Sequence, residues 1–223
     1  NPMGELGNGT SNDSSVTVQV LGLTDITEIS SSGSHTLALK SNGNVWSWGV
    51  NRVMQLGNGT YGDTVVPTQV VGFGGIGYLT NIKEISAGVN HSFALKNDGT
   101  VYSWGQVAAD YGFALGTDLM YGSVTPLKVE NETGTGYIGN IKSIAAGNHH
   151  ALLLDENGDV YSFGINEKGQ LGTGNIINYV LPTKISTLSN VSKIEAGDEY
   201  SIIVKNDGSM WSWGNNASGQ LGN

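Results

Sequence analysis

The sequence predicts an all-β protein, specifically a β-propeller built from four-stranded antiparallel blades, and two observations support this prediction. The first is a pattern that runs from Ser34 to Gly49 and returns three more times, over residues 90–105, 149–164 and 199–214. The second is an Asn-Gly or Asp-Gly pair inside every copy, the strongest short-range signal for a β-hairpin. Repeats of about 50 residues are typical of propeller blades, which stack because one blade cannot bury both faces alone.

Each repeat is expected to contain four strands in a fixed order. The first is short and apolar, and the second alternates, with His35, Leu37 and Leu39 on one face. The third alternates small residues with aromatic ones such as Trp46 and Trp48. Three of the four prolines share one position in the fourth strand, and because proline cannot donate to a ladder, this strand belongs at the outer edge of the sheet. The expected first strands are residues 26–29, 82–85, 141–144 and 191–194, and the expected fourth strands are residues 65–70, 124–129 and 180–185.

The repeats divide the chain without any linker between them. Residues 1–223 are therefore expected to form a single propeller segment. Its repeats cover approximately residues 1–29, 30–85, 86–144, 145–194 and 195–223, of which the first and the last are partial.

Charge and composition exclude several classes of function. The formal net charge is −9 and the ten lysines and arginines are scattered singly, whereas nucleic-acid binding needs clustered cations that release counterions from phosphate. The sequence therefore predicts no nucleic-acid partner. No stretch is long and apolar enough for membrane insertion, and the absence of cysteine excludes disulfide and thiolate chemistry.

The repeats strongly resemble the regulator of chromosome condensation repeat. The segments AGVNHSFAL, VYSWG, INEKGQLG and WSWGNNASGQLG carry the resemblance, which covers the whole chain in register. It implies binding platforms that usually have seven blades. Members of the family include a nuclear protein that exchanges nucleotide on a small GTPase and binds chromatin, and a secreted bacterial inhibitor of β-lactamases. The chain most resembles the bacterial, alpha-tubulin-suppressor-like members, and bacterial members of the family are often modules of large surface proteins.

Four repeats in a family of seven-bladed rings predict a partial, open arc. The two ends of the chain have the same phase in the repeat, since Asn1 aligns with Asn216. A closed four-bladed ring is the alternative. An open arc exposes an apolar blade face at each end, so we expect the isolated chain to self-associate through these faces.

Most of the recurring residues are expected to be structural. The histidines begin the second strand and are expected to hydrogen-bond nearby backbone. Metal binding is the rejected alternative, because ligands must lie about 2 Å from one ion and equivalent residues of neighbouring blades lie farther apart. The tryptophans are expected to pack between blades, rather than to form a carbohydrate platform. These repeat-signature residues are His35, His91, His150, Trp48, Trp104, Trp213, Gly88, Gly147 and Gly197.

Insertions relative to the 50-residue repeat provide the candidate binding residues. Two insertions of six residues, within GGIGYLTNIK (residues 74–83) and TGTGYIGNIK (residues 133–142), place Gly-x-Gly-Tyr at the same point of neighbouring repeats. A third lies in QVAADYGFALG. Loops on a rigid scaffold commonly bind partners, and tyrosine is favoured at binding hot spots. The candidates are Phe73, Tyr78, Tyr137, Tyr111 and Phe113, and the alternative is that the tyrosines only cover the seam between blades.

No catalytic constellation is apparent in the sequence. The acidic turn at residues 155–159 lacks the ligand spacing of a calcium loop, and no Ser-His-Asp group or pair of carboxylates stands out from the repeats. We therefore expect neither an enzyme, nor a cofactor, nor a metal.

These observations predict a non-catalytic protein-interaction module with a protein partner. The favoured setting is a larger secreted or surface-displayed bacterial protein, which implies an extracellular or cell-surface location. The alternative is a cytoplasmic regulatory propeller, either exchange-factor-like or linked to the cytoskeleton. A propeller enzyme, such as a glycosidase, is the least favoured of the three.

Overall fold

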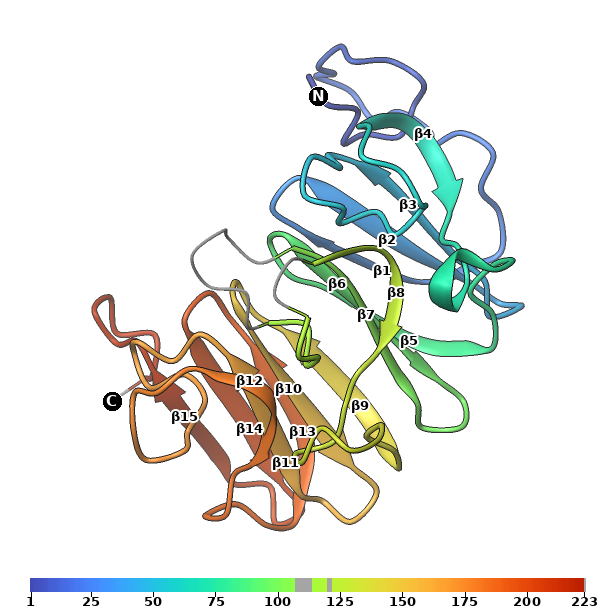
Figure 1. Cartoon of the computed structure of the whole chain (residues 1–223). Coiled ribbons are helices and arrows are strands. Elements are labelled where there is room, and N and C mark those ends of the chain that lie inside the picture. Colours follow the sequence, from blue (N-terminus) through green and yellow to red (C-terminus); the bar gives the residue numbers. More distant parts are fainter. Residues whose placement is uncertain (107–113, 120–121, 223) are drawn as a thin grey trace.

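Four antiparallel sheets stacked along an arc make up the computed structural model, which describes residues 1–106, 114–119 and 122–222 (Figure 1). Fifteen strands form these sheets. Among the described residues there is no α-helix, and the one helical element is a short 3₁₀ turn, η1 (Phe73–Gly75). The prediction of an all-β propeller is therefore confirmed.

Each sheet is one blade, and its strands lie side by side in chain order. Blade 1 contains β1 (Ile26–Ser32), β2 (His35–Lys40), β3 (Val45–Gly49) and β4 (Thr64–Gln69). Blade 2 contains β5 (Ile82–Ala87), β6 (His91–Lys96), β7 (Val101–Gly105) and β8 (Ser123–Lys128). Blade 3 contains β9 (Ile141–Ala146), β10 (His150–Asp155), β11 (Val160–Gly164) and β12 (Tyr179–Lys184). Blade 4 contains β13 (Val191–Ala196), β14 (Tyr200–Lys205) and β15 (Met210–Gly214).

Blade 4 differs from the expected four strands, because its sheet has only three. In blades 1 and 3 the fourth strand begins fifteen residues after the third strand ends, and only nine residues follow Gly214. The sequence therefore stops before it reaches the position of a fourth strand.

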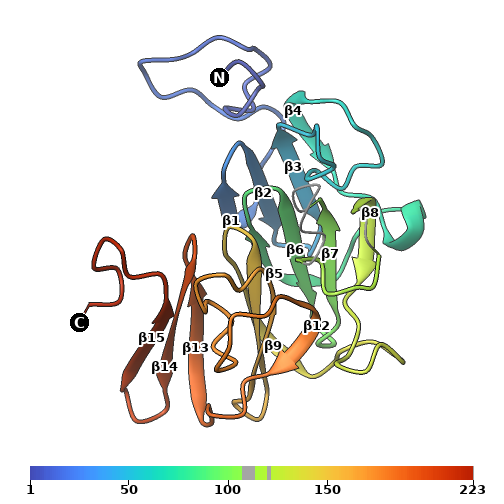
Figure 2. The same ribbon diagram turned by 60° about the vertical axis from the view of Figure 1, so that its left-hand side comes forward.

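The four blades form an open arc. Both views place the N-terminal end beside blade 1 and the C-terminal end beside blade 4, at opposite ends of the stack (Figures 1 and 2). Each end presents an apolar side chain to solvent, with Ile29 71% exposed on β1 and Met210 69% exposed on β15. The self-association that such faces would promote stays a prediction.

Apolar side chains fill each junction between neighbouring blades. The second and third strands of one blade pack against the first three strands of the next, so that each junction has its own hydrophobic cluster. At the first junction, Leu37, Leu39 and Val45 of blade 1 pack in one cluster with Ile82 and Ile85 of blade 2. Burying one such side chain contributes about 1.5–3 kcal/mol, so these clusters are the main force that stacks the blades.

The hairpin turn of each blade also binds the next blade. The Gly43 carbonyl accepts a hydrogen bond of 3.1 Å from the Ile82 N–H at the start of β5. Gly43 has a φ of +79°, and an added Cβ would lie 3.1 Å from the backbone of Asn81. Glycine is therefore required here both for the turn and for the close approach of the next blade. The same contact recurs from Ile141 to Gly99 and from Val191 to Gly158.

Polar side chains of the first strands add further contacts between blades. The Glu84 carboxylate accepts hydrogen bonds from the Ser143 hydroxyl at 2.8 Å and from the Ile144 N–H at 2.9 Å. Glu28 accepts in the same way from the Ile85 N–H at 3.3 Å. Partial burial raises the pKa of both Glu28 and Glu84 above the usual value for a glutamate.

Candidate functional site

The two six-residue insertions adopt the same hydrogen-bonded loop after the fourth strands of blades 1 and 2. In the first, the Gly72 N–H donates to the Gly77 carbonyl at 2.9 Å, and the Gly75 N–H donates to the Gly72 carbonyl at 2.9 Å. In the second, the same pattern joins Asn131 to Gly136 and Gly134 to Asn131, at 2.9 and 3.0 Å. Glycine-rich composition suggests loops that turn freely, whereas these backbone bonds hold each insertion in a defined shape.

A lysine joins the two insertions into one surface. The Lys128 ammonium, at the end of β8, lies 5.4 Å from the ring centre of Phe73 and 5.0 Å from that of Tyr137. Phe73 belongs to the first insertion loop and Tyr137 to the second, and both are about half exposed. Cation–π attraction of this kind contributes about 0.5–1 kcal/mol at an exposed site. Lys128 therefore holds two aromatic rings from successive loops on either side of its own charge.

The other candidate binding residues lie elsewhere. Tyr78 forms an isolated bridge with Val71 and is 60% exposed, and it does not line the pocket that Phe73 and Tyr137 share. Phe73 lines this pocket together with Tyr137. Tyr111 and Phe113 lie outside the described residues.

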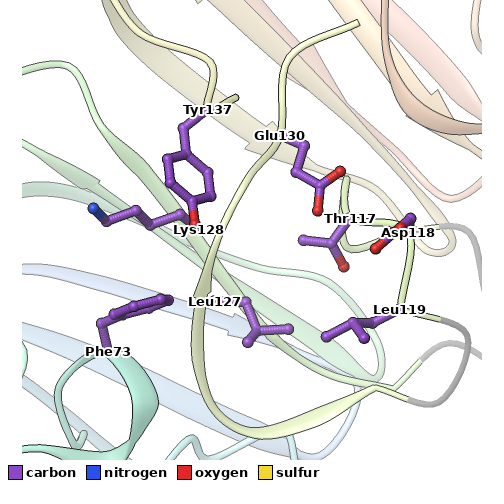
Figure 3. Close-up of a pocket in the computed structure, with 8 residues that line it drawn as sticks. All are labelled: Phe73, Thr117, Asp118, Leu119, Leu127, Lys128, Glu130 and Tyr137. Atoms are coloured by element: carbon purple, nitrogen blue, oxygen red, sulfur yellow. The ribbon is translucent and has the colours of Figure 1, made fainter. Parts of the chain in front are cut away.

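The pocket between these loops has two chemically different ends. It has a volume of about 240 Å³ and is lined by Phe73, Thr117, Asp118, Leu119, Leu127, Lys128, Glu130 and Tyr137. Figure 3 shows Thr117, Asp118 and the Glu130 carboxylate gathered on one side, with the Lys128 ammonium pointing to the opposite side. The pocket therefore has an acidic end and a cationic, aromatic end, with Leu127 between them (Figure 3).

The acidic end is partly shielded from water. Burial raises the pKa of Glu130, and the nearby charge of Asp118 raises it further, although the Asp118 N–H donates a hydrogen bond to this carboxylate. The Thr117 side chain is only 3% exposed, and its hydroxyl forms no hydrogen bond with the described residues. Two carboxylates and an unpaired hydroxyl therefore lie next to one another.

Sequence reasoning missed Thr117, Asp118, Lys128 and Glu130. They come from the β7–β8 loop, the end of β8 and the residues after it, and none belongs to an insertion motif. The one available signal was the position of Lys128 and Glu130 directly before the second Gly-x-Gly-Tyr insertion.

Two of the three signature histidines, His35 and His150, form hydrogen bonds between blades, and not to nearby backbone as expected. His35 Nε2 lies 2.8 Å from the Ser92 hydroxyl of blade 2, which in turn donates to the Gln55 carbonyl at 2.8 Å. Because the hydroxyl uses its single proton on that carbonyl, His35 Nε2 must be the donor to the serine oxygen. His150, Ser201 and the Gln170 carbonyl form the same relay between blades 3 and 4, at 3.0 and 2.8 Å.

The relay is missing between blades 2 and 3. Ala151 occupies the position of Ser92 and Ser201, and neither ring nitrogen of the fully buried His91 has a hydrogen-bond partner in the part of the chain that the structure describes. The ring instead packs edge-on against Phe93, with 5.4 Å between their centres. His91 is thus held by apolar packing, because the side chain that would receive its proton is an alanine.

Burial keeps these three imidazoles neutral. It lowers the pKa of His35 and His150 to about 4 and that of His91 to about 3. Within the described residues, no three His, Cys, Asp or Glu side chains form a group that could hold a metal ion.

The tryptophans and glycines of the repeat signature also lie at the blade junctions. The Trp104 indole N–H donates to the Gln55 carbonyl at 2.9 Å, which therefore accepts from two side chains of blade 2. Trp48 and Trp213 make the same bond to the carbonyls of Glu5 and Gln170, at 2.9 and 2.8 Å. Phe163 replaces the tryptophan in blade 3 and has no N–H to donate.

The signature glycines make room for the ring of the second strand. A Cβ added to Gly88 would lie 2.3 Å from His91 Cε1 and 2.6 Å from the Gly147 carbonyl oxygen. A Cβ on Gly147 or Gly197 would meet the ring of His150 or Tyr200 at 2.3 or 2.2 Å. Larger residues at these positions would therefore displace the ring.

Comparison with known proteins identifies the family. A family model described as an RCC1-like domain matches residues 1–223. The chain belongs to the RCC1-like family. This RCC1-like chain is 33% identical over 187 residues to the ultraviolet-B receptor UVR8 of Arabidopsis thaliana, covering 83% of the chain and 40% of the receptor. It is 31% identical over 148 residues to the regulator of chromosome condensation of Homo sapiens, covering 66% of the chain and 33% of that protein.

Solved structures agree with this assignment. Prp20p of Saccharomyces cerevisiae superimposes with a TM-score of 0.73 at 29% identity, over 88% of this RCC1-like chain and 46% of Prp20p. Human WBSCR16, at 22% identity, shares the fold with a TM-score of 0.75 over 97% of this chain and 57% of its own. The chain thus spans less than half the length of the relatives matched by sequence. None of the described elements is a helix long and apolar enough to cross a membrane.

Proposed function

We propose that this RCC1-like chain is a non-catalytic module that binds a protein, and that the partner contacts the pocket between the two insertion loops. The observation that carries the proposal is the Phe73–Lys128–Tyr137 arrangement. Two half-exposed rings from successive blades are held around one cation beside a pocket. Aromatic residues beside a concave surface are typical of binding hot spots.

The relatives support a role in protein binding. Prp20p was solved in a study of its binding to Gsp1p and histones, and yeast RCC1 (Prp20) was also solved bound to Kap60. These are partners of Prp20p alone. We carry over only the class of function, which is recognition of a protein without chemical conversion of it.

The setting of the module is also a proposal. We favour a secreted or surface-displayed bacterial protein, on the resemblance of the repeats to bacterial surface modules. The alternative, an intracellular regulator, is supported by the likeness to the human regulator of chromosome condensation. Cell fractionation of the source organism, followed by detection of the full-length protein, would decide between the two locations.

The binding proposal is tested with a double variant, Phe73→Ala with Tyr137→Ala. Partners captured by the unchanged chain are identified by mass spectrometry, produced separately, and titrated against both proteins. We expect the double variant to bind at least about tenfold more weakly, or 1.4 kcal/mol. The matched control is Tyr61→Ala with Tyr78→Ala, which removes two similarly exposed tyrosines away from the pocket.

Two results would overturn the proposal. One is equal affinity of the unchanged chain and the Phe73/Tyr137 variant while the circular-dichroism spectra of the two agree. The other is an equal loss in the control variant, which would show that exposed aromatic surface in general, and not this pocket, binds the partner.

A further inference from the structure

We propose that the acidic end of this pocket binds an arginine side chain presented by a basic segment of the partner protein. This inference rests on the proposed function and names the chemical group of the partner that the pocket would recognise. The guanidinium would lie between Asp118, Glu130 and Thr117, with its aliphatic stem against Leu119 and Leu127.

The two carboxylates of the pocket are not paired with a cation in the described part of the chain. No ion pair among the described residues involves Asp118 or Glu130. The undescribed segments, residues 107–113 and 120–121, contain no lysine or arginine that could supply one. Lys128 shares the pocket, but its ammonium lies over the rings of Phe73 and Tyr137, on the side away from Glu130 (Figure 3).

The hydroxyl of Thr117, which lines the pocket, also favours a donor there. This oxygen is buried and has no hydrogen-bond partner among residues 1–106, 114–119 and 122–222. A buried hydroxyl that forms no hydrogen bond is destabilising, and a donor that enters the pocket would remove this cost. It supplies a third acceptor beside the two carboxylates.

The set of acceptors fits a guanidinium better than an ammonium. Arginine carries five N–H donors in a flat fork, so it can reach acceptors on several residues at once, whereas lysine offers one compact charge. At about 240 Å³ the pocket is smaller than the roughly 300–1,000 Å³ typical of small-molecule sites. A single side chain therefore suits it better than a cofactor.

The charge of the chain favours the same partner. A net charge of −9 attracts basic segments over a distance and speeds their encounter with the pocket. After docking, the Lys128 ammonium at the other end would meet an acidic or carbonyl group of the same segment. The pocket would then select an arginine with such a group near it, rather than any positive charge.

The experiment uses two probes of nearly the same shape, N-acetyl-arginine amide and N-acetyl-citrulline amide. Each is titrated into the whole chain while backbone amide signals are followed by NMR. We expect the arginine probe to shift the signals of Thr117, Asp118 and Glu130, and the neutral citrulline probe to bind at least about tenfold more weakly. N-acetyl-lysine amide should bind more weakly than arginine.

The variants Glu130→Gln and Thr117→Val should each weaken binding of the arginine probe at least about fivefold. Glu156→Gln is the matched control, since it removes one exposed carboxylate in a hairpin turn and changes the net charge equally. Glutamine at position 130 keeps an acceptor for the Asp118 N–H, so the loop should stay folded.

Equal binding of arginine and citrulline, or unchanged binding in both pocket variants, would overturn the inference. This failure is distinct from failure of the proposed function. If protein capture depends on Phe73 and Tyr137 but the arginine probe does not bind, the binding surface stands and its arginine specificity is wrong. If the probe binds but capture is unaffected in the aromatic variant, the pocket stands and its role in binding the partner is wrong.

Discussion

The substitution Ala151→Ser should rebuild the hydrogen-bond relay that is missing between blades 2 and 3. In the other two junctions a serine hydroxyl links the histidine of one blade to a backbone carbonyl. At this junction the corresponding carbonyl belongs to Ala114. The two buried ring nitrogens of the histidine, His91, have no partner among the described residues. The new hydroxyl would accept from His91 Nε2 and donate to the Ala114 carbonyl, with the geometry of its neighbours.

The expected gain is the difference between two opposing effects. Satisfying a buried nitrogen recovers about 1–3 kcal/mol, and the new bond to the carbonyl adds about 1 kcal/mol. Burying a hydroxyl in place of a methyl hydrogen costs about 1–3 kcal/mol. We therefore expect Ala151→Ser to raise the free energy of unfolding by about 1 kcal/mol, and the reverse change, Ser92→Ala, to lower it by about 1–3 kcal/mol.

Urea unfolding of four chains measures the effect: the unchanged chain, Ala151→Ser, His91→Ala and the double variant. The gain from serine should disappear in the His91→Ala background, because the hydroxyl then loses its donor. The coupling free energy between the two positions should be about 1 kcal/mol, within the usual range for residues in contact. An equal effect of serine in both backgrounds would refute the relay, and would show that residue 151 acts only through packing.

Two further predictions concern the repeat signature. Gly88→Ala should lower the free energy of unfolding by more than about 2 kcal/mol, because the added Cβ would overlap the His91 ring. The control, Gly62→Ala, has open space around it and should change the free energy of unfolding by less than about 0.5 kcal/mol. Similar urea midpoints for the two variants would contradict the close packing at Gly88. In NMR titrations the imidazoles of His35, His91 and His150 should stay neutral from pH 8 to pH 5, because burial lowers their pKa to about 4, 3 and 4. In the unfolded chain these imidazoles bind protons below about pH 6.5, whereas in the folded chain they stay neutral. The histidines therefore stabilise the fold fully above about pH 6.5 and progressively less as the pH falls toward 4. Titration of all three near pH 6.5 would show that they are open to water.

The fold could be predicted from the sequence because each of the four repeats contains the same strand and turn signals. The Asn42-Gly43 pair and its equivalents located every hairpin. The predicted fourth strands differ from β4, β8 and β12 by one residue at each end, and the predicted first strands begin at the observed residue but end two or three residues too early. Pro67 and its equivalents located the outer strand in the same way. Four independent copies of one local pattern leave little room for a different arrangement.

The histidine contacts show where this reasoning stops. The sequence indicates that His35 is structural, but its partner, Ser92, lies one repeat away and on the facing surface of another blade. Which residues face each other across a junction depends on the stagger between two sheets. Periodicity within one strand contains no information about that stagger.

The candidate site was predicted only in part for a related reason. Phe73 and Tyr137 stood out because insertions interrupt the repeat, whereas Thr117 and Glu130 occupy ordinary positions in it. Their importance comes from burial and from the absence of a nearby cation at one corner of blade 2. Both are properties of the packed loops, and a single sequence shows neither of them.

The contact between the turn of one blade and the first strand of the next has a consequence for how the chain folds. Gly43 and Ile82, like the later pairs, are separated by less than one repeat, and the histidine relays span only about one. Contacts of such short range close quickly and do not need the far end of the chain. A ribosome making this protein would therefore release it blade by blade, with each new repeat covering the apolar face left open by the one before. At every stage of synthesis, the open apolar faces would be limited to the outer face of blade 1 and that of the most recent blade.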